Sequence, residues 1–203
     1  MEEIENFQGY CLYKTNINYS LSQEEKNYIS NLEYGSDDNK NFLSKDRYIL
    51  ENPLFSNLSK IIDKYADHYI KNLLEVDHKL KRLNSWATIN KHDGSHHPHQ
   101  HANTFISVCF YPQVKDGGIG FEAYQDPIRS RTNLKLNIIN DNTFNSRTFN
   151  FKLSSQDLVI FPGWLHHHGQ PNKSNQDRVM IGCNYFISGD IGDLESVDNL
   201  YLG

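Results

Sequence analysis

Hydrophobic residues in the first third of the chain recur at helical spacing. Ser22-Gln23-Glu24-Glu25 has the pattern of a capping box, in which Ser22 and Glu25 satisfy each other's backbone amides. It predicts a helix that ends near Gly35. Asn52-Pro53 predicts a second helix, since Asn is a good N-cap and proline loses no bond in the first turn. Its apolar face is expected to pack on a sheet and consists of Leu54, Leu58, Ile61, Ile62, Tyr65, Tyr69 and Leu73.

From residue 83 onward, short β-branched and aromatic runs alternate with Gly, Asn, Asp and Pro. They predict strands over 83–90, 104–111, 119–123, 134–139, 148–153, 158–161 and 179–187. Short strands in close succession favour a sandwich or jelly roll over a parallel α/β sheet. The polar stretch 125–145 predicts a loop that is mobile in part. We expect one domain over 1–203, with a mainly helical part over 1–82 and a jelly-roll core over 83–190.

Composition narrows the functional classes. The 203 residues carry a net charge of −5, with no dense Lys/Arg stripe, so there is no nucleic-acid signature. No apolar run is long enough to span a bilayer, and the acidic N-terminus has no signal-peptide core. Three isolated cysteines indicate reduced thiols. We expect a cytoplasmic protein that acts on a small-molecule or peptide substrate, with a homo-oligomer left open.

Eight of the ten histidines lie in two segments, over 92–101 and 166–168, each beside a predicted strand. Neutral imidazole is the commonest protein ligand for transition metals. In an extended segment, His99 and His101 point to the same side and can share one ion. The 166–168 segment follows a buried strand and can supply a third ligand. The other interpretation is that these histidines are solvated turn residues.

Arg178 lies at the start of the strand predicted over 179–187, downstream of the second histidine segment. A guanidinium beside a metal can bind a carboxylate through two parallel hydrogen bonds. The alternative is a surface ion pair with Asp177. The position relative to the histidines favours the carboxylate clamp.

These segments together resemble the 2-oxoglutarate/iron(II)-dependent oxygenases, and most closely a group of bacterial and phage proteins. The resemblance covers residues 84–186. It rests on the following residues: Ser85-Trp86-Ala87-Thr88-Ile89-Asn90, Gly94, His99-Gln100-His101, Ser107, Gly118–Phe121, Asp126-Pro127, Asp157 to His167, Pro171-Asn172 and Asp177 to Asn184.

The resemblance implies a mostly β fold, a double-stranded β-helix (a cupin-like jelly roll) with N-terminal helices packed on one sheet. It further implies an oxygenase, expected to be a hydroxylase, that consumes dioxygen and 2-oxoglutarate and releases succinate and carbon dioxide. By matching positions, His99 and His167 are the Fe(II) ligands, with His101 as the candidate third. Arg178 is the partner of the distal carboxylate of the cosubstrate.

Two positions depart from the broader superfamily. Where it has Asp or Glu, this chain has His101, so either three imidazoles bind the metal or His101 does not bind it. Many relatives have a serine two residues after the arginine, whereas this chain has Met180. Another donor to the carboxylate is then needed, and Tyr111 and Tyr185 are the candidates.

Three other functions fit the same histidines. A cupin-type three-histidine metalloenzyme would use no 2-oxoglutarate and would need no clamp at Arg178. A zinc hydrolase would need a general base; none obviously accompanies the ligands, and Glu122 and Asp126 are the remaining candidates. A jelly-roll module that binds metal without catalysis would hold it weakly.

Overall fold

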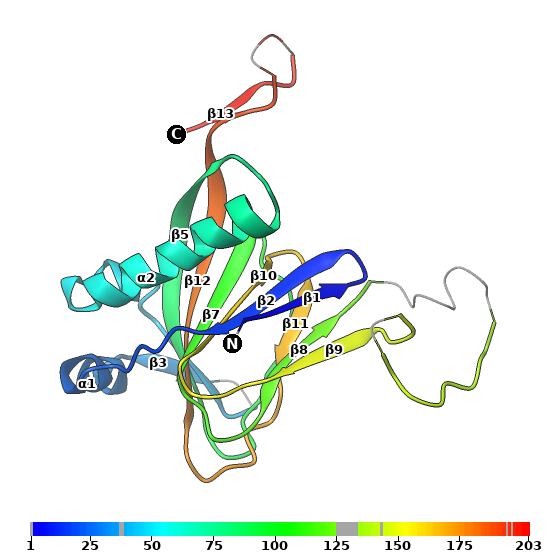
Figure 1. Ribbon diagram of the computed structural model, residues 1–203. Helices are drawn as coiled ribbons and strands as arrows, with labels where there is room; N and C mark the ends of the chain where they lie inside the picture. The colour runs from blue at the N-terminus through cyan, green and yellow to red at the C-terminus, as the bar shows by residue number, and fades with distance from the viewer. Residues whose placement is uncertain (1, 37–38, 125–133, 143, 194, 196) are drawn as a thin grey trace.

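The computed structural model describes residues 2–36, 39–124, 134–142, 144–193, 195 and 197–203. Two antiparallel sheets form the body of the protein (Figure 1). The main sheet has the order β1 (Glu3–Phe7), β2 (Tyr10–Asn16), β10 (Asp157–Pro162), β7 (Ile106–Gln113), β12 (Arg178–Ile191), β5 (Lys79–Asn90), β4 (Asn41–Ser44) and β3 (Tyr34–Ser36). A short strand, β13 (Leu200–Leu202), pairs with the far end of β12.

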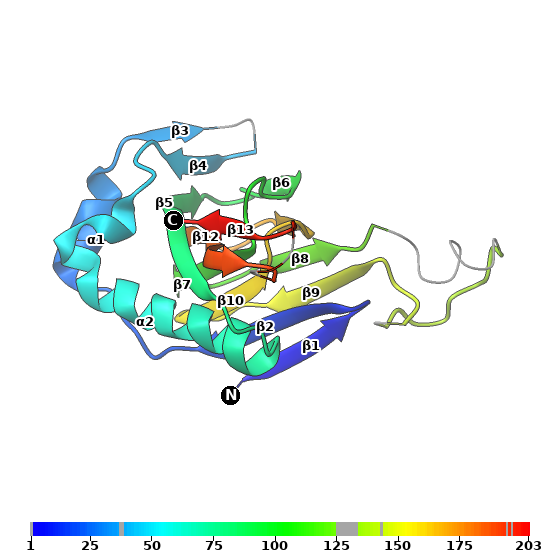
Figure 2. The same ribbon diagram turned by 90° about the horizontal axis from the view of Figure 1, so that it is seen from above.

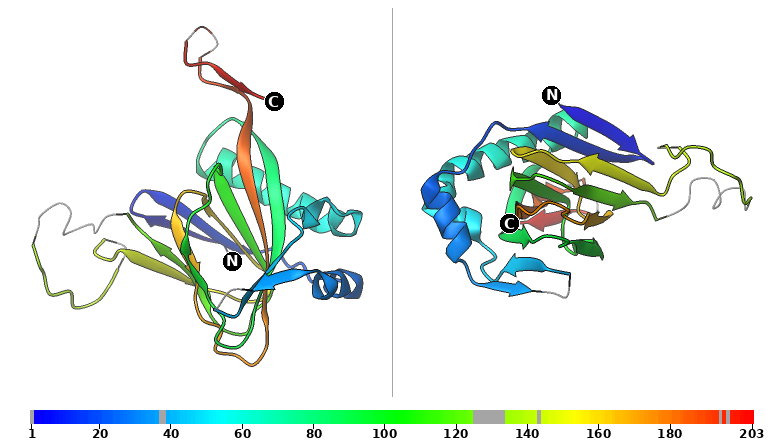
Figure 3. Two further views of the ribbon diagram at one scale, coloured as in Figure 1. Left: turned by 180° about the vertical axis from the view of Figure 1, so that it is seen from behind. Right: turned by 90° about the horizontal axis from the view of Figure 1, so that it is seen from below.

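The smaller sheet has the order β6 (His96–His99), β11 (His166–Gly169), β8 (Gly118–Glu122) and β9 (Thr148–Lys152). It faces the main sheet, and the helices lie on the other side of the main sheet (Figures 2 and 3). This is the predicted jelly roll with helices packed on one sheet.

The helices form for the reasons that the sequence suggests. α1 (Gln23–Asn31) has the predicted capping box, with Glu25 N donating to Ser22 Oγ at 3.1 Å and Ser22 N donating to Glu25 Oε2 at 2.7 Å. It ends at Asn31 rather than near Gly35, because Gly35 belongs to β3.

The second helical segment begins where Asn52 Oδ1 accepts from Leu54 N. Three short pieces flank its main helix: 3₁₀ turns over Ile49–Glu51 and Pro53–Phe55 before α2 (Ser56–His68), and a π turn over Tyr69–Leu73 after it. None of the described helices is both long and apolar enough to cross a membrane.

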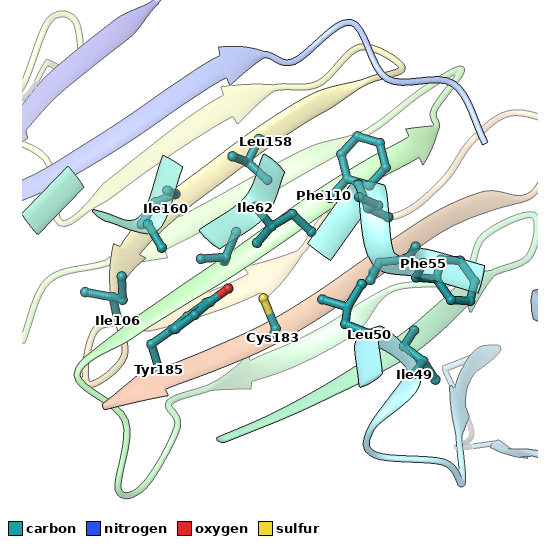
Figure 4. Packing of buried hydrophobic residues seen from close by; sticks show 14 of the residues in the cluster. Ile49, Leu50, Phe55, Ile62, Ile106, Phe110, Leu158, Ile160, Cys183 and Tyr185 are labelled. Carbon is teal, nitrogen blue, oxygen red and sulfur yellow. The ribbon is translucent and has the colours of Figure 1, made fainter. Parts of the chain in front are cut away.

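The two faces of the main sheet bury two hydrophobic cores. Along β10, Leu158 and Ile160 pack toward the helices, while Val159 and Phe161 pack between the sheets. Figure 4 shows the helix-side core, where Ile62 of α2 lies over the main sheet. Side chains alternate between the two faces along each strand, so only every second residue of a strand can reach the space between the sheets.

The strands expected over 83–90, 104–111, 119–123, 148–153, 158–161 and 179–187 correspond to β5, β7, β8, β9, β10 and β12. The prediction of a strand over 134–139 is wrong, since this segment has no strand structure. β8 and β9, which flank it, pair directly with each other and leave it outside the sheet. Ile139 is 93% exposed, so the apolar residues of this segment do not indicate that it is buried. Part of the loop expected over 125–145 lies outside the described residues.

Residues 1–82 are less helical than expected, because they also supply β1 to β4. β1 and β2 form a hairpin whose two turn residues, Gln8 and Gly9, have φ values of 52° and 88°. Positive φ at both positions matches the turn that the twist of a hairpin prefers. β1 forms one edge of the main sheet and is rich in acidic residues, so its apolar alternation is too weak to predict a strand.

Candidate metal and cosubstrate site

Three histidines meet where the smaller sheet faces the main sheet. His99 ends β6 and lies directly opposite His167 of β11 in the strand register. His101 follows two residues later, and its backbone amide donates to Gly163 O at 2.9 Å. Pairing of the two histidine segments therefore creates the site, which neither segment holds alone.

The ring nitrogens of these histidines are close enough to share one ion. His99 Nε2 and His101 Nε2 are 3.2 Å apart. The ring centroid of His167 lies 4.3 Å from that of His99 and 4.9 Å from that of His101. One nitrogen from each residue falls within 4.8 Å of the other two.

The opposite ring nitrogens fix the orientation of each imidazole. Nδ1 of His99 bonds to His97 O at 2.8 Å, and Nδ1 of His167 bonds to Leu165 O at 2.9 Å. A carbonyl oxygen only accepts, so Nδ1 carries the proton and Nε2 keeps its lone pair. Two lone pairs 3.2 Å apart repel each other unless a cation lies between them, and a divalent metal therefore fits this arrangement.

His101 is held by two residues that the sequence motifs had not assigned a role. Its Nδ1 lies 2.8 Å from Asn184 Oδ1 and 2.7 Å from Ser107 Oγ. Ser107 Oγ itself donates to Asn184 Oδ1 at 2.9 Å, so the amide oxygen is left to accept from the ring. Trp86 packs edge-on against the same ring, with centroids 5.5 Å apart.

Burial keeps the three imidazoles neutral. Burial, together with the smaller effect of the neighbouring His99, lowers the pKa of His101 to about 4. Burial lowers the pKa of His99, and it holds the pKa of His167 well below its ordinary value. Only neutral imidazole binds a metal, so all three rings are ready as ligands at neutral pH.

Arg178 begins β12 opposite Asn90 of β5 and is buried, with 2% of its surface exposed. Its Nη2 donates to Gln170 O at 2.6 Å and to Asn90 Oδ1 at 3.2 Å. Its Nη1 is buried and has no hydrogen-bond partner among the residues that the structure describes. Within the described part of the chain, no carboxylate pairs with this guanidinium, and Asp177 pairs with Lys91 instead. The surface ion pair with Asp177 is therefore excluded.

One cavity joins the histidines to Arg178. Trp86 and the three histidines lie at one end, and Arg178 with Asn90 lies at the other. The intervening wall consists of Cys109, Tyr111, Ile119, Met180, His96, His168 and Gly169. Gly117 leaves room for the guanidinium, since a Cβ at this position would lie 2.2 Å from Arg178 Nη1.

The two tyrosines predicted as extra donors lie on opposite faces of the main sheet. Tyr111 lines the cavity, and burial raises its pKa well above the ordinary value, so its hydroxyl stays protonated. Tyr185 lies in the helix-side core (Figure 4) and donates to Asp63. The prediction of a cosubstrate contact at Tyr185 is therefore wrong, because Tyr185 stands at an odd offset from Arg178 along β12 and points to the other face of the sheet.

The remaining histidines of the second segment do not belong to the group that could share one ion, although His168 lines part of the cavity wall. His166 lies beside Tyr124, with ring centroids 6.0 Å apart, and His168 Nδ1 lies 3.5 Å from Glu122 Oε1. They alternate with His167 along β11, which explains why only the middle residue points between the sheets. Sequence reasoning also missed Asn90 and Asn184. The signal for Asn184 was its even spacing from Arg178 on one strand.

The fold and the geometry define a jelly-roll protein in which three imidazoles, placed so that they could share one ion, and a buried guanidinium line one cavity. Residues 84–184, about half of the chain, match the family described as "Putative 2OG-Fe(II) oxygenase". The matched segment contains all three histidines and Arg178. The chain belongs to this family, and it is an Fe(II)- and 2-oxoglutarate-dependent oxygenase.

Solved structures show the same fold at low sequence identity. HygX from Streptomyces hygroscopicus, solved with nickel, 2-oxoglutarate and hygromycin B bound, is 12% identical with a TM-score of 0.60, over 88% of this chain and 84% of HygX. The Trichoplax adhaerens prolyl hydroxylase, in complex with a peptide fragment of hypoxia inducible factor, is 13% identical with a TM-score of 0.58, over 89% of this chain and 84% of the hydroxylase.

An oxidoreductase of the 2OG-Fe(II) oxygenase family from Burkholderia pseudomallei is 9% identical with a TM-score of 0.57, over 85% of this chain and 83% of that protein. No curated protein matches this chain in sequence.

Proposed function

We propose that His99, His101 and His167 bind Fe(II) through Nε2, and that Arg178 binds the distal carboxylate of 2-oxoglutarate. The enzyme then acts as a hydroxylase on a small molecule or peptide. One observation carries this proposal: the metal-binding nitrogens and the unpartnered Arg178 Nη1 lie at the two ends of one cavity. The nickel and 2-oxoglutarate bound in HygX support the same assignment.

Each residue has a distinct part in this scheme. Arg178 offers the buried N–H groups of Nη1 to the carboxylate, and Tyr111 offers a protonated hydroxyl from the neighbouring strand. Many relatives have a serine where this chain has Met180. In this chain, Tyr111 supplies the hydroxyl that the serine provides in those relatives. The apolar side chains of Ile119 and Met180 exclude water along the cavity, which strengthens the charge-assisted hydrogen bonds.

Asn184 and Ser107 hold the His101 ring so that Nε2 points at the metal. When bound, Fe(II) and 2-oxoglutarate supply the redox chemistry, in which oxidative decarboxylation to succinate and carbon dioxide is coupled to substrate oxidation. A third imidazole in place of a carboxylate makes the metal site one charge more positive. This change favours binding of an anionic cosubstrate.

A location in the reducing cytosol is part of the proposal. Cys11, Cys109 and Cys183 are all free thiols. Burial raises the pKa of Cys109 to about 12, so this thiol stays protonated inside the cavity and does not compete for the metal.

The test is anaerobic reconstitution with Fe(II) followed by titration with 2-oxoglutarate. We expect a visible metal-to-ligand charge-transfer band, and succinate formation once air is admitted. His167→Ala and His101→Ala should abolish the band. His92→Ala is the matched control, because His92 lies in the same segment but its ring contacts Ser174 O and Asp93 and is not among the three proposed ligands.

Bound Fe(II) without the band and without succinate would overturn the proposal. It would favour a three-histidine metalloenzyme that does not use 2-oxoglutarate. A band of full intensity and affinity in His101→Ala would instead show that His101 is not a ligand.

A further inference from the structure

A second group of imidazoles lies beside the proposed Fe(II) site, at the edge of the smaller sheet. His96, His97 and His99 of β6 each place one ring nitrogen within 4.8 Å of the others. The ring centroids of His96 and His99 are 4.2 Å apart, and those of His97 and His99 are 5.4 Å apart. Neighbours along a regular strand point to opposite faces. The 5.0 Å between the centroids of His96 and His97 therefore shows a local departure that gathers the rings.

The sheet makes room for this departure at one position. Gly169 of β11 lies opposite His96, where the strand register shifts. A Cβ at residue 169 would lie 3.2 Å from His96 Cβ and 3.3 Å from Arg178 Nη2. The missing side chain lets His96 turn into the cavity, which it lines.

Burial increases from this outer group to the proposed Fe(II) ligands. His97 is exposed, His96 and His99 are partly buried, and His167 is only 4% exposed. The imidazoles thus form a continuous path from solvent to the buried site. His99 belongs to both groups.

The shared ring decides how the two groups can work together. His99 Nδ1 is bonded to His97 O, which leaves only Nε2 to bind a metal. The outer group, His96 with His97 and His99, and the inner group, His99 with His101 and His167, are therefore alternative positions for one ion. They do not form a two-metal centre.

We propose that His96 and His97 form, with His99, an outer metal-binding position through which the ion enters the inner site. This inference rests on the proposed function of His99, His101 and His167. The ion exchanges bound waters for His97 and His96 at the surface. It then exchanges these imidazoles for His101 and His167 while His99 stays bound. No bond to carbon and no oxidation state changes in these steps.

The distinguishing consequence is kinetic. A residue that serves only as an intermediate position lowers the barrier between solvent and the inner site in both directions. Its removal slows association and dissociation by the same factor and leaves the dissociation constant unchanged. A true ligand of the inner site behaves differently, because its loss speeds dissociation and weakens binding.

The test uses Co(II) and the full chain, with absorbance in stopped flow for association and a chelator chase for dissociation. His96→Ala and His97→Ala should slow both rates several-fold at an unchanged dissociation constant. His92→Ala, in the same segment but outside both groups, should match the wild type. His97 is exposed, so its variant should keep the fold.

Unchanged rates in both variants would overturn the inference while leaving the proposed function intact. A dissociation constant that rises in step with the dissociation rate would also overturn it, and would make His96 or His97 an inner ligand. Co(II) binding that is unaltered in His167→Ala would contradict the proposed function itself, and the entry path with it.

Discussion

Replacement of Arg178 by glutamine should weaken 2-oxoglutarate binding far more than it alters the fold. The guanidinium is buried, and no hydrogen-bond partner of Nη1 is found in the described part of the chain. A carboxylate that fills this position gains charge-assisted hydrogen bonds worth about 1.5–3 kcal/mol each. Truncation of one partner of such a buried pair typically costs about 2–5 kcal/mol. A loss of about 3 kcal/mol corresponds to a dissociation constant roughly 100-fold higher.

The measurement is anaerobic titration of the Fe(II)-loaded variant with 2-oxoglutarate, followed through the charge-transfer band. Arg82→Gln is the matched control. Arg82 is also largely buried, but it pairs with Glu51 and Asp63 near Tyr185 on the helix side of the sheet. It should leave the dissociation constant unchanged. A folded Arg178→Gln protein that binds 2-oxoglutarate within about threefold of the wild type would refute the clamp, since threefold is under 1 kcal/mol.

Three further predictions follow from the same geometry. Asn184→Ala should weaken Co(II) binding about 10–100-fold, the usual cost of losing a partner behind a metal ligand; unchanged affinity in a competition titration would contradict this role. Gly117→Ala should reduce 2-oxoglutarate affinity, because its Cβ would lie 2.2 Å from Nη1, whereas Gly9→Ala, with a similar positive φ and open space around it, should only destabilise the fold. Metal-free protein should lose stability as pH falls from about 6.5 to about 4. Burial lowers the pKa of His101 to about 4, so in this range the unfolded chain binds more protons than the folded one. Urea unfolding should show a smaller loss in His101→Ala, and an equal loss in both proteins would be the opposing result.

Local sequence determined much of the framework. The capping box at Ser22 and the Asn52-Pro53 start fix two helices through contacts within a few residues. Strand periodicity placed β5, β7, β8, β9, β10 and β12. These signals are readable because each depends on near neighbours along the chain. The apolar run over 134–139 misled the prediction because a strand needs a partner strand, and β propensity alone does not supply one.

The sequence also supplied the candidate ligands, but tertiary pairing chose among them. The residue patterns could not say which of three successive histidines points inward. The register of β6 against β11 selects His167 by placing it opposite His99. Tyr111 and Tyr185 were equal candidates in the sequence until the main sheet turned them to opposite faces.

His101 shows most clearly what the tertiary structure adds. In the sequence it stood where relatives have a carboxylate, and its role was open. In the fold, Ser107 of β7 and Asn184 of β12 meet its Nδ1 from strands far along the chain. Chemical identity is a property of the residue, and so the sequence revealed the imidazoles and the guanidinium. Orientation and burial arise only when distant strands pack, and these decide which nitrogens face a shared ion.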